Sequence, residues 1–295
     1  GLVDRIVESD LLERARAFAL EVAEGDMPVP LMERAAIAPA EAEAFEARKA
    51  RIRHKARGQR SPVAAIEAVE RALMLDADAA FAAERDAFET LRASEQSAAL
   101  RHVFFAERSV SKIDRAKGAD ARSLNRIGVV GGGTMGAGIA AACLLSKLPV
   151  VMVERDAEAA EAGSDRVLGI LDGSAKRGLL SPDGRQAAEE ALTTSADYAA
   201  LCDCDLIVEA VFEDMAVKRE VFADLDRVAR PDAVLASNTS YLDIDEIAAG
   251  TRDPSRVIGL HFFSPAHVMK LLELIVTRQA APDVLATGLA LGKRL

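Results

Sequence analysis

The sequence has no tryptophan, few aromatic residues and little cysteine. Aromatic residues make up 4% of its 295 positions, and the three cysteines are Cys143, Cys202 and Cys204. Three irregularly spaced cysteines do not make a disulfide framework, which favours a reducing compartment. No second cluster of Cys or His accompanies Cys202 and Cys204, so we expect no metal site. Long apolar runs are also missing; none approaches the roughly 20 residues of a membrane span, so we expect no such span.

Basic residues are fewer than acidic ones, and the formal net charge is −10. This balance argues against a nucleic-acid binder, whose binding surface is basic, and we expect no nucleic-acid partner. Gly1–Arg5 lack the charged and then apolar pattern of a signal peptide. Together with the richness in Ala and Arg, this predicts a cytoplasmic protein. Because the chain does not begin with Met, we interpret it as a fragment.

The first 118 residues have a helical pattern, rich in Ala, Glu, Arg and Leu. Ile66, Val69 and Leu73 recur at helical spacing, and no strand-like alternation competes with them. Phe81 and Phe88 continue one face of a further helix, and we expect both side chains to lie in the core. The polar stretch around Gly118 predicts a linker into a second part of the chain.

After this linker, short apolar segments alternate with helical ones. The predicted strands are Ile127–Val130, Val150–Glu154, Leu206–Glu209, Ala233–Ser237, Val257–His261 and Leu271–Val276. Alternation of this kind predicts a doubly wound parallel sheet. The long stretch between the second and third strands, Asp156–Tyr198, has a helical pattern interrupted between Gly178 and Gly184, which predicts a helix-turn-helix excursion.

Three glycines stand between the first strand and the next helix. Gly131 allows a tight turn, Gly133 lets backbone N–H groups approach a pyrophosphate, and Gly136 lets the helix pack closely on the strand. The phosphates would then lie at the positive end of the helix. This context predicts a Rossmann-type dinucleotide site in an α/β fold that an all-helical segment precedes.

An acidic residue, Glu154, ends the second strand. A carboxylate at this place can accept hydrogen bonds from both hydroxyls of the adenine ribose, which favours NAD over NADP. Arg155 follows directly and could attract the 2′-phosphate of NADP, but Glu154 would repel the same group. The sequence therefore predicts NAD as the cofactor.

Polar residues follow the later strands, where the ligands of such sheets bind. They are Glu209–Glu213 with Lys218, Ser237–Ser240, His261–Pro265 and, within the last strand, Glu273. His261 is a candidate general base, and the carboxylate twelve residues later would fix its tautomer and stabilise the imidazolium. Each residue also has a structural reading: Asn238 and Ser240 as turn residues, and His261 as a hydrogen-bonded core histidine.

These motifs resemble the L-3-hydroxyacyl-CoA dehydrogenases, specifically the multifunctional fatty acid β-oxidation proteins in which an enoyl-CoA hydratase precedes the dehydrogenase. The motifs are Gly-Gly-Gly-Thr-Met-Gly-Ala-Gly from Gly131, Val208–Asp214 with Lys218, Ser237–Ser240, His261–Pro265 and Met269–Glu273. Their order and spacing match the family from about Asn125 to Val276.

The earlier part of the chain adds to the resemblance. Gly1–Val7 resembles the closing segment of a hydratase domain, and Ser94–Arg108 resembles the helix that joins the two activities. The resemblance implies two parts: residues 1–118, the end of the hydratase domain with its linker helix, and residues 119–295, the NAD-binding domain. Since the hydratase core is missing, we expect no hydratase activity from this chain.

The resemblance implies a role for each residue of the site. The implied catalytic residues are His261 as base, Glu273 as its partner, Ser240 as donor to the reacting oxygen, and Ser264. The position of Ser264 is Asn in the single-function dehydrogenases and often Ser in the multifunctional ones. The implied NAD contacts are Gly131, Gly133, Thr134, Met135, Gly136, Glu154 on the adenine ribose, and Glu213 and Lys218 on the nicotinamide ribose. The implied reaction is NAD-dependent oxidation of an L-3-hydroxyacyl-CoA.

The partners implied are an acyl-CoA substrate and, through a C-terminal helical domain beyond Leu295, a homodimer or a β-oxidation complex. Lys176 and Arg177 could meet the phosphates of coenzyme A or be solvated surface residues. Without the C-terminal domain the chain is expected to bind NAD yet turn over poorly. Two alternatives stay open: a dehydrogenase of another 3-hydroxy acid, and a non-catalytic NAD-binding fragment.

Overall fold

The computed structural model describes residues 5–25, 42–110 and 112–295. The chain divides into two compact units, Gly1–Glu107 (unit 1) and Arg108–Leu295 (unit 2). Residues 1–4 of the segment Gly1–Val7, which resembles the end of a hydratase domain, lie outside the described residues. Residue 111, close to the predicted linker, lies outside them as well. The predicted domain boundary between residues 118 and 119 stays a prediction.

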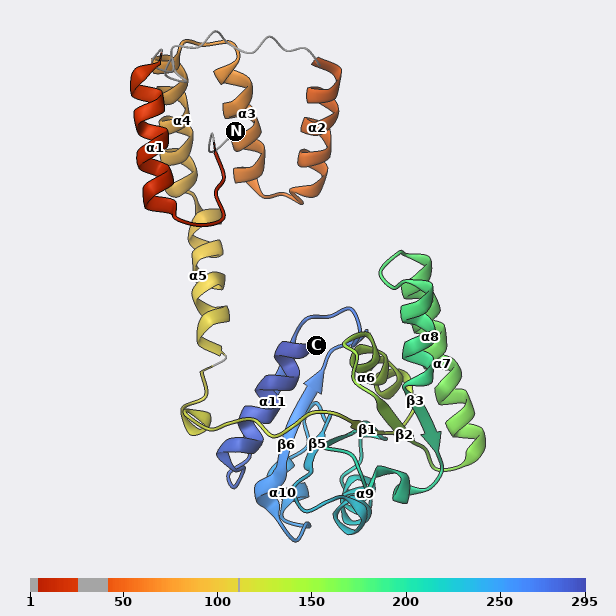
Figure 1. Ribbon diagram of the computed structural model, residues 1–295. Coiled ribbons are helices and arrows are strands. Elements are labelled where there is room, and N and C mark those ends of the chain that lie inside the picture. The colour runs from red at the N-terminus through yellow and green to blue at the C-terminus, as the bar shows by residue number, and fades with distance from the viewer. Residues whose placement is uncertain (1–4, 26–41, 111) are drawn as a thin grey trace. The chain divides into compact units, whose positions relative to one another are not determined.

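All the regular secondary structure in the described part of unit 1 is helical. Its helices are α1 (Leu11–Glu24), α2 (Ala42–Lys55), α3 (Arg60–Ala72) and α4 (Ala77–Arg92), and α5 (Glu95–Val110) continues into unit 2 (Figure 1). The prediction for Phe81 and Phe88 is wrong, since these side chains are 52% and 59% exposed. Among the described residues of unit 1, the buried apolar ones are Ala56 and Ile66. A helical spacing shows which residues share a face but not whether another element covers that face.

Unit 2 contains a seven-stranded sheet with the order β3-β2-β1-β4-β5-β6-β7. The strands are β1 (Ile127–Val130), β2 (Val150–Val153), β3 (Leu192–Ser195), β4 (Leu206–Glu209), β5 (Val234–Ser237), β6 (Val257–Phe262) and β7 (Leu272–Ile275). All neighbouring strands are parallel except β6 and β7, which are antiparallel. The predicted doubly wound α/β fold is confirmed, and its sheet is parallel except at this edge, where β7 runs antiparallel. The connection over residues 263–271 is too short for a crossover, so the chain returns as a hairpin.

The excursion after β2 contains the two predicted helices and one strand that the pattern did not reveal. Helix α7 (Ala157–Lys176) and helix α8 (Pro182–Glu190) are joined around Gly178, whose φ is +71°. Strand β3 then pairs with β2 at the edge of the sheet. Its sequence is Leu-Thr-Thr-Ser, and none of its residues is fully buried. A half-exposed, mostly polar edge strand lacks the apolar run from which the other strands were predicted.

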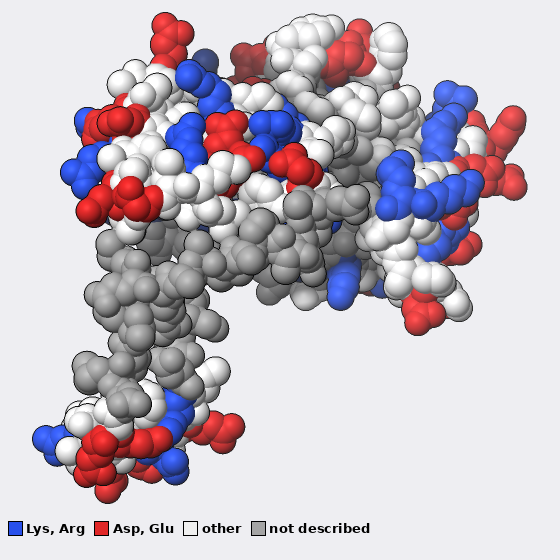
Figure 2. All heavy atoms as spheres, turned by 90° about the horizontal axis from the view of Figure 1, so that it is seen from above, with Lys and Arg blue, Asp and Glu red and all other residues white. Residues whose placement is uncertain are grey.

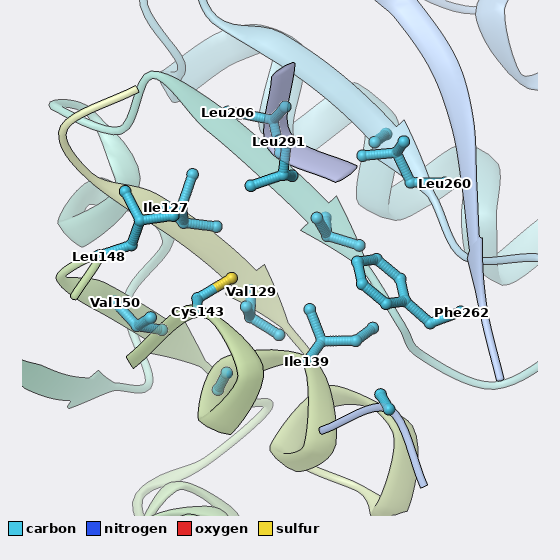
Figure 3. Packing of buried hydrophobic residues seen from close by; sticks show 14 of the residues in the cluster. Ile127, Val129, Ile139, Cys143, Leu148, Val150, Leu206, Leu260, Phe262 and Leu291 are labelled. Atoms are coloured by element: carbon cyan, nitrogen blue, oxygen red, sulfur yellow. The ribbon is translucent and has the colours of Figure 1, made fainter. Parts of the chain in front are cut away.

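Helices cover both faces of the sheet, in three layers (Figure 1). On one face α6 (Thr134–Leu145), α7, α8 and α11 (Pro282–Arg294) share a core cluster with β1, β2, β4, β5 and β6. On the other face α9 (Met215–Val228), α10 (Ile244–Ala248) and the 3-10 turn Tyr198–Leu201 form a second cluster. Figure 3 shows Phe262, at the end of β6, pointing into the first cluster, which also contains Ile139 of α6.

The segment before β1 belongs structurally to unit 2. Ala116, in the 3-10 turn Asp114–Ala116, lies in the core cluster of the α6 face. Arg115 donates from Nη1 to the carbonyl oxygen of Thr277 at 2.8 Å. Arg122 donates from Nε to the Asp283 carboxylate of α11 at 2.7 Å. These contacts attach the segment to the residues that follow β7 and to α11.

The surface charge is mixed. Acidic and basic side chains are interspersed over the face drawn in Figure 2. Of the helices that the structure describes, none combines the length and the apolar character needed to cross a membrane. Among the same residues, no cluster of three or more His, Cys, Asp or Glu side chains could hold a metal ion.

Candidate active site

The carboxyl ends of β1, β2, β4, β5 and β6 lie at one edge of the sheet because these neighbouring strands are parallel. Every predicted site residue except Glu273 comes from this edge or from a helix that begins there. Glu273 lies on β7, where the antiparallel register pairs it directly with His261. The topology thus brings together residues that are up to 142 positions apart in the sequence, from Gly131 to Glu273.

The glycine loop has the geometry that its sequence predicts. Gly131 has a φ of +95°, a conformation that side chains rarely adopt, and a Cβ there would lie 2.8 Å from the carbonyl oxygen of Ala210. A Cβ on Gly136 would lie only 1.7 Å from the carbonyl oxygen of Gly131. A Cβ on Gly133 would meet nothing within 4 Å. Gly131 and Gly136 are therefore required by close backbone contacts within the fold, whereas Gly133 leaves the space beside the loop open.

The N-terminus of α6 faces this open space. Gly133 is the N-cap residue and provides no side-chain cap, so the first N–H groups of the helix are left for another acceptor. Gly133 and Thr134 are exposed. Helix N-termini attract anions through both their N–H groups and the helix dipole. The loop therefore fits the pyrophosphate of a dinucleotide.

Glu154 reaches back from the end of β2 to the same loop. Its Oε1 accepts a hydrogen bond from the Gly132 N–H at 2.7 Å, and its Oε2 accepts one from the Arg155 N–H at 3.0 Å. The side chain of Arg155 turns away to Asp156, with Nε 3.1 Å from Oδ2, and is 83% exposed. Glu154 is thus fixed beside the loop, and each of its oxygens retains a lone pair for a ribose hydroxyl.

A second acidic residue, Glu209, lies fully buried at the end of β4. Its Oε1 is 2.6 Å from Nζ of Lys218, whose side chain is 1% exposed, and accepts the Val211 N–H at 2.8 Å. Its Oε2 accepts the Ser237 hydroxyl at 2.6 Å. A buried ion pair is tolerated when hydrogen bonds satisfy the remaining polar atoms, as they do here.

Glu213 connects this buried pair to the surface. Its Oε2 lies 3.1 Å from Nζ of Lys218, and its Oε1 accepts hydrogen bonds from the Thr239 hydroxyl at 2.5 Å and the Ser240 N–H at 2.8 Å. Burial acts to raise the pKa of Glu213, but the hydrogen bonds from Thr239 and Ser240 and the Lys218 ammonium hold this pKa below the usual 4.5. Glu213 is therefore a carboxylate at neutral pH.

His261 and Glu273 form a hydrogen-bonded pair across β6 and β7. Nδ1 of His261 is 2.8 Å from Oε2 of Glu273, and the two side chains are 19% and 53% exposed. Because a carboxylate accepts at Nδ1, this nitrogen carries the proton and Nε2 is left to accept another. The Phe263 ring lies against the imidazole, with the centroids 4.6 Å apart. These two contacts fix the orientation of the imidazole ring.

A cavity of about 390 Å³ gathers these side chains. Among the residues that line it are Met135, Glu213, Ser240, His261 and Ser264. Lys218 does not line it and lies behind Glu213. Lys176 and Arg177, at the end of α7, are exposed and do not line it either. The structure therefore brings Ser240, His261 and Ser264 to one cavity, which Met135 of α6 also lines, while Glu273 does not line it and contacts the site through His261.

Three contacts near the cavity involve residues to which the sequence pattern assigned no catalytic or cofactor-binding role. Glu209 holds Lys218, Thr239 holds Glu213, and the Asn238 amide oxygen accepts the Phe262 N–H at 2.8 Å, next to His261. One feature of the sequence could have indicated the contact between Glu209 and Lys218: an acidic residue ends the otherwise apolar strand Leu-Ile-Val-Glu. An acid that is buried there must have a partner, because an unpaired buried charge is too costly.

Comparison with known proteins gives this site a family context. Residues 126–295 match the family model described as 3-hydroxyacyl-CoA dehydrogenase, NAD binding domain. The chain is 37% identical over 302 residues to the peroxisomal bifunctional enzyme of Cavia porcellus, with 100% of this chain and 42% of that protein covered. It is 34% identical over 302 residues to the glyoxysomal fatty acid beta-oxidation multifunctional protein MFP-a of Brassica napus, with the same coverage. The chain spans about two fifths of the length of these relatives.

Solved structures are similar as well. The (S)-3-hydroxybutyryl-CoA dehydrogenase PaaH1 from Ralstonia eutropha is 36% identical, with a TM-score of 0.57, over 58% of this chain and 61% of that one. The match to the family model lies within unit 2, which holds the glycine loop and the cavity. The resemblance inferred from the motifs is confirmed.

Proposed function

Because this chain belongs to the 3-hydroxyacyl-CoA dehydrogenase family and contains its NAD-binding domain, we propose that the protein oxidises L-3-hydroxyacyl-CoA to 3-oxoacyl-CoA with NAD. The observation that carries the proposal is the His261–Glu273 pair, whose His261 lines one cavity with Ser240, Glu213 and Met135 of α6. In this reaction a proton leaves the 3-hydroxyl group and a hydride leaves C3. When bound, NAD supplies the acceptor for that hydride.

His261 takes the hydroxyl proton on Nε2. Its Nδ1 is engaged by Glu273, so the lone pair needed for proton transfer is on the other ring nitrogen. The Glu273 carboxylate stabilises the imidazolium that forms, as the acidic member of a catalytic triad does. In this structure the Ser240 hydroxyl donates to Oε1 of Glu213 at 3.3 Å, and in the reaction it turns to donate this hydrogen to the reacting oxygen. Ser264 lines the same cavity as a second candidate.

The NAD contacts follow the loop and the strand ends. Gly131, Gly133 and Gly136 shape the pyrophosphate site together with the backbone of Thr134 and Met135, and Glu154 accepts from the adenine ribose. Glu213 accepts from the nicotinamide ribose, and Lys218 acts behind it. The fixed carboxylate of Glu154 and the turned-away Arg155 support NAD over NADP.

Four further assignments belong to the same proposal. The domain boundary is placed between residues 118 and 119, Lys176 and Arg177 meet the coenzyme A phosphates, and a C-terminal domain supplies the dimer or complex contacts. We propose a cytoplasmic location on the composition, whereas the relatives from Cavia porcellus and Brassica napus are named peroxisomal and glyoxysomal. Imaging of the fluorescently tagged protein in its own cells distinguishes these compartments.

The experiment that tests the activity is oxidation of NADH with acetoacetyl-CoA as substrate, measured for the protein and for His261→Ala. We expect turnover to fall by about 10²- to 10⁴-fold in the variant, the usual contribution of a positioned general base, while NADH binding is unchanged. Normal NADH binding in both proteins excludes misfolding as the cause.

Two other results would decide for the alternatives. Binding of NADH without turnover in either protein would make this chain a non-catalytic NAD-binding fragment. Turnover of free 3-hydroxy acids with none of the coenzyme A ester would indicate a dehydrogenase of another substrate class. Equal turnover of both proteins with the coenzyme A ester would reject His261 as the base.

A further inference from the structure

The most elaborate polar network of the site lies beneath the cavity rather than in it. It joins Ser237 to Glu209, Glu209 to Lys218, and Lys218 to Glu213, over distances of 2.6, 2.6 and 3.1 Å. The exposed fraction of the side chains rises along this path, from 0% for Glu209 and 1% for Lys218 to 29% for Glu213. The network therefore runs from the interior of the sheet to the cavity.

Glu209 is placed to control where the charge of Lys218 acts. One ammonium group lies between two carboxylates, and the shorter contact is to the buried one. The neutral donors around Glu209, the Val211 N–H and the Ser237 hydroxyl, fix its orientation. Lys218 is thereby held in one place by a fixed carboxylate, and cannot turn fully to Glu213.

This arrangement determines what Glu213 presents to the cavity. The three charges sum to −1, and the excess lies on Glu213, because Glu209 and Lys218 are the closest pair. Oε2 of Glu213 is held by Lys218, while Oε1 receives Thr239 and Ser240. With Glu209 neutral, Lys218 would pair with Glu213 alone and draw its carboxylate inward, away from Ser240.

We propose that Glu209 is a positioning residue of the NAD site, which acts through Lys218 to hold the Glu213 carboxylate and Ser240 in place at the cavity. The inference rests on the proposed contact between Glu213 and the cofactor. Glu209 itself does not line the cavity.

The test is a double-mutant cycle on NADH binding, with the variants Glu209→Gln, Glu213→Gln and the pair combined. We expect Glu209→Gln to weaken NADH binding at least fivefold in the original protein and less than twofold in the Glu213→Gln background. A merely structural residue would lower stability without this dependence on Glu213. The change to Gln keeps the size and the acceptor oxygen and removes the charge.

The matched control is Asp226→Asn, which removes a buried carboxylate from the same helix as Lys218. Asp226 pairs with Arg252 and Arg256, at 2.7 and 2.6 Å, and takes no part in the site. Its replacement should lower the free energy of unfolding but leave NADH binding unchanged. If Glu209→Gln does not fold, Ser237→Ala replaces it: this variant keeps all three charges, frees Oε2 of Glu209, and should show a smaller loss with the same dependence on Glu213.

The outcomes separate the two proposals because NADH binding does not require turnover. Equal weakening by Glu209→Gln in both backgrounds, or no weakening in a folded variant, would overturn the positioning role while leaving the dehydrogenase activity untouched. If Glu213→Gln binds NADH normally, Glu213 is not a cofactor contact and the positioning role fails with it. Loss of acetoacetyl-CoA turnover bears on the proposed function alone.

Discussion

At the level of single residues, the glycines of the nucleotide loop differ in what surrounds them. Gly136 has a carbonyl oxygen 1.7 Å from where a Cβ would stand, whereas Gly133 has open space and an ordinary φ of −66°. The motif contains both glycines, but for different physical reasons. The fold requires Gly136, whereas the ligand requires Gly133. Substitution by Ala separates these reasons.

Gly136→Ala should lower the free energy of unfolding by about 1–3 kcal/mol, since the added methyl group forces α6 away from the loop. Gly133→Ala should change it by less than about 0.5 kcal/mol and still weaken NADH binding at least tenfold, because its methyl group occupies the space of the pyrophosphate. Urea unfolding and NADH titration of both variants measure the contrast. Normal NADH binding by a folded Gly133→Ala protein would show that the phosphates lie elsewhere.

The buried acid of β4 marks the limit of prediction at this scale. The sequence singles out Glu209–Glu213 and Lys218 as a group, but it does not reveal that Lys218 is buried or that Glu209 is its main partner. Burial depends on neighbours from α9 and β5, which are brought together only in the folded chain. His261 was predicted with two readings, and the cavity beside its ring supports the functional one.

At the level of elements, β6 carries the site because both of its sides are fixed. Phe262 points into the core beside α6, and His261 pairs with β7. Gly259 faces the other side of the sheet from Phe262 and allows α10 to pack closely on β6. A Cβ on Gly259 would lie 2.3 Å from Cδ1 of Ile244 on α10 and 2.7 Å from Cβ of Ile275 on β7. The strand therefore has room for nothing larger than glycine at this position.

Gly259→Ala should destabilise unit 2 by about 1–3 kcal/mol through overpacking. Ile244→Val removes Cδ1 and should recover part of this loss in the double variant, although it costs about 0.5–1.5 kcal/mol alone. Urea unfolding of the two single variants and the double variant measures the coupling. Strictly additive losses would mean that Ile244 is not what Gly259 contacts in solution.

At the level of the whole molecule, the two units have very different interiors. Among the described residues, unit 1 buries the apolar side chains of Ala56 and Ile66, whereas unit 2 has two extensive core clusters. Since apolar burial is the main stabilising contribution, unit 1 of this chain should be the less stable of the two. Helix α4, which exposes both Phe81 and Phe88, gains little from packing.

We therefore expect this chain to unfold in two steps in urea, unit 1 first. Both tyrosines, Tyr198 and Tyr241, lie in unit 2, and there is no tryptophan, so tyrosine fluorescence reports on unit 2 while far-UV circular dichroism reports on both units. Circular dichroism should decrease at a lower urea concentration than tyrosine fluorescence. NADH should shift only the second step, by about 2.7 kcal/mol at a hundredfold excess over Kd. Coincident transitions would show that the units unfold together.

The sequence by itself determined the α/β class, most strand positions, the glycine loop and the family, because these depend on local periodicity and on residues that a phosphate or a turn requires. It did not reveal β3, the antiparallel direction of β7, or the partners of Lys218. An edge strand with polar residues has no apolar signature, strand direction depends on where the returning chain finds an open edge, and a buried ion pair depends on elements that meet only in the fold. The tertiary structure alone decided these points, since each depends on how separate elements pack against one another in the folded chain.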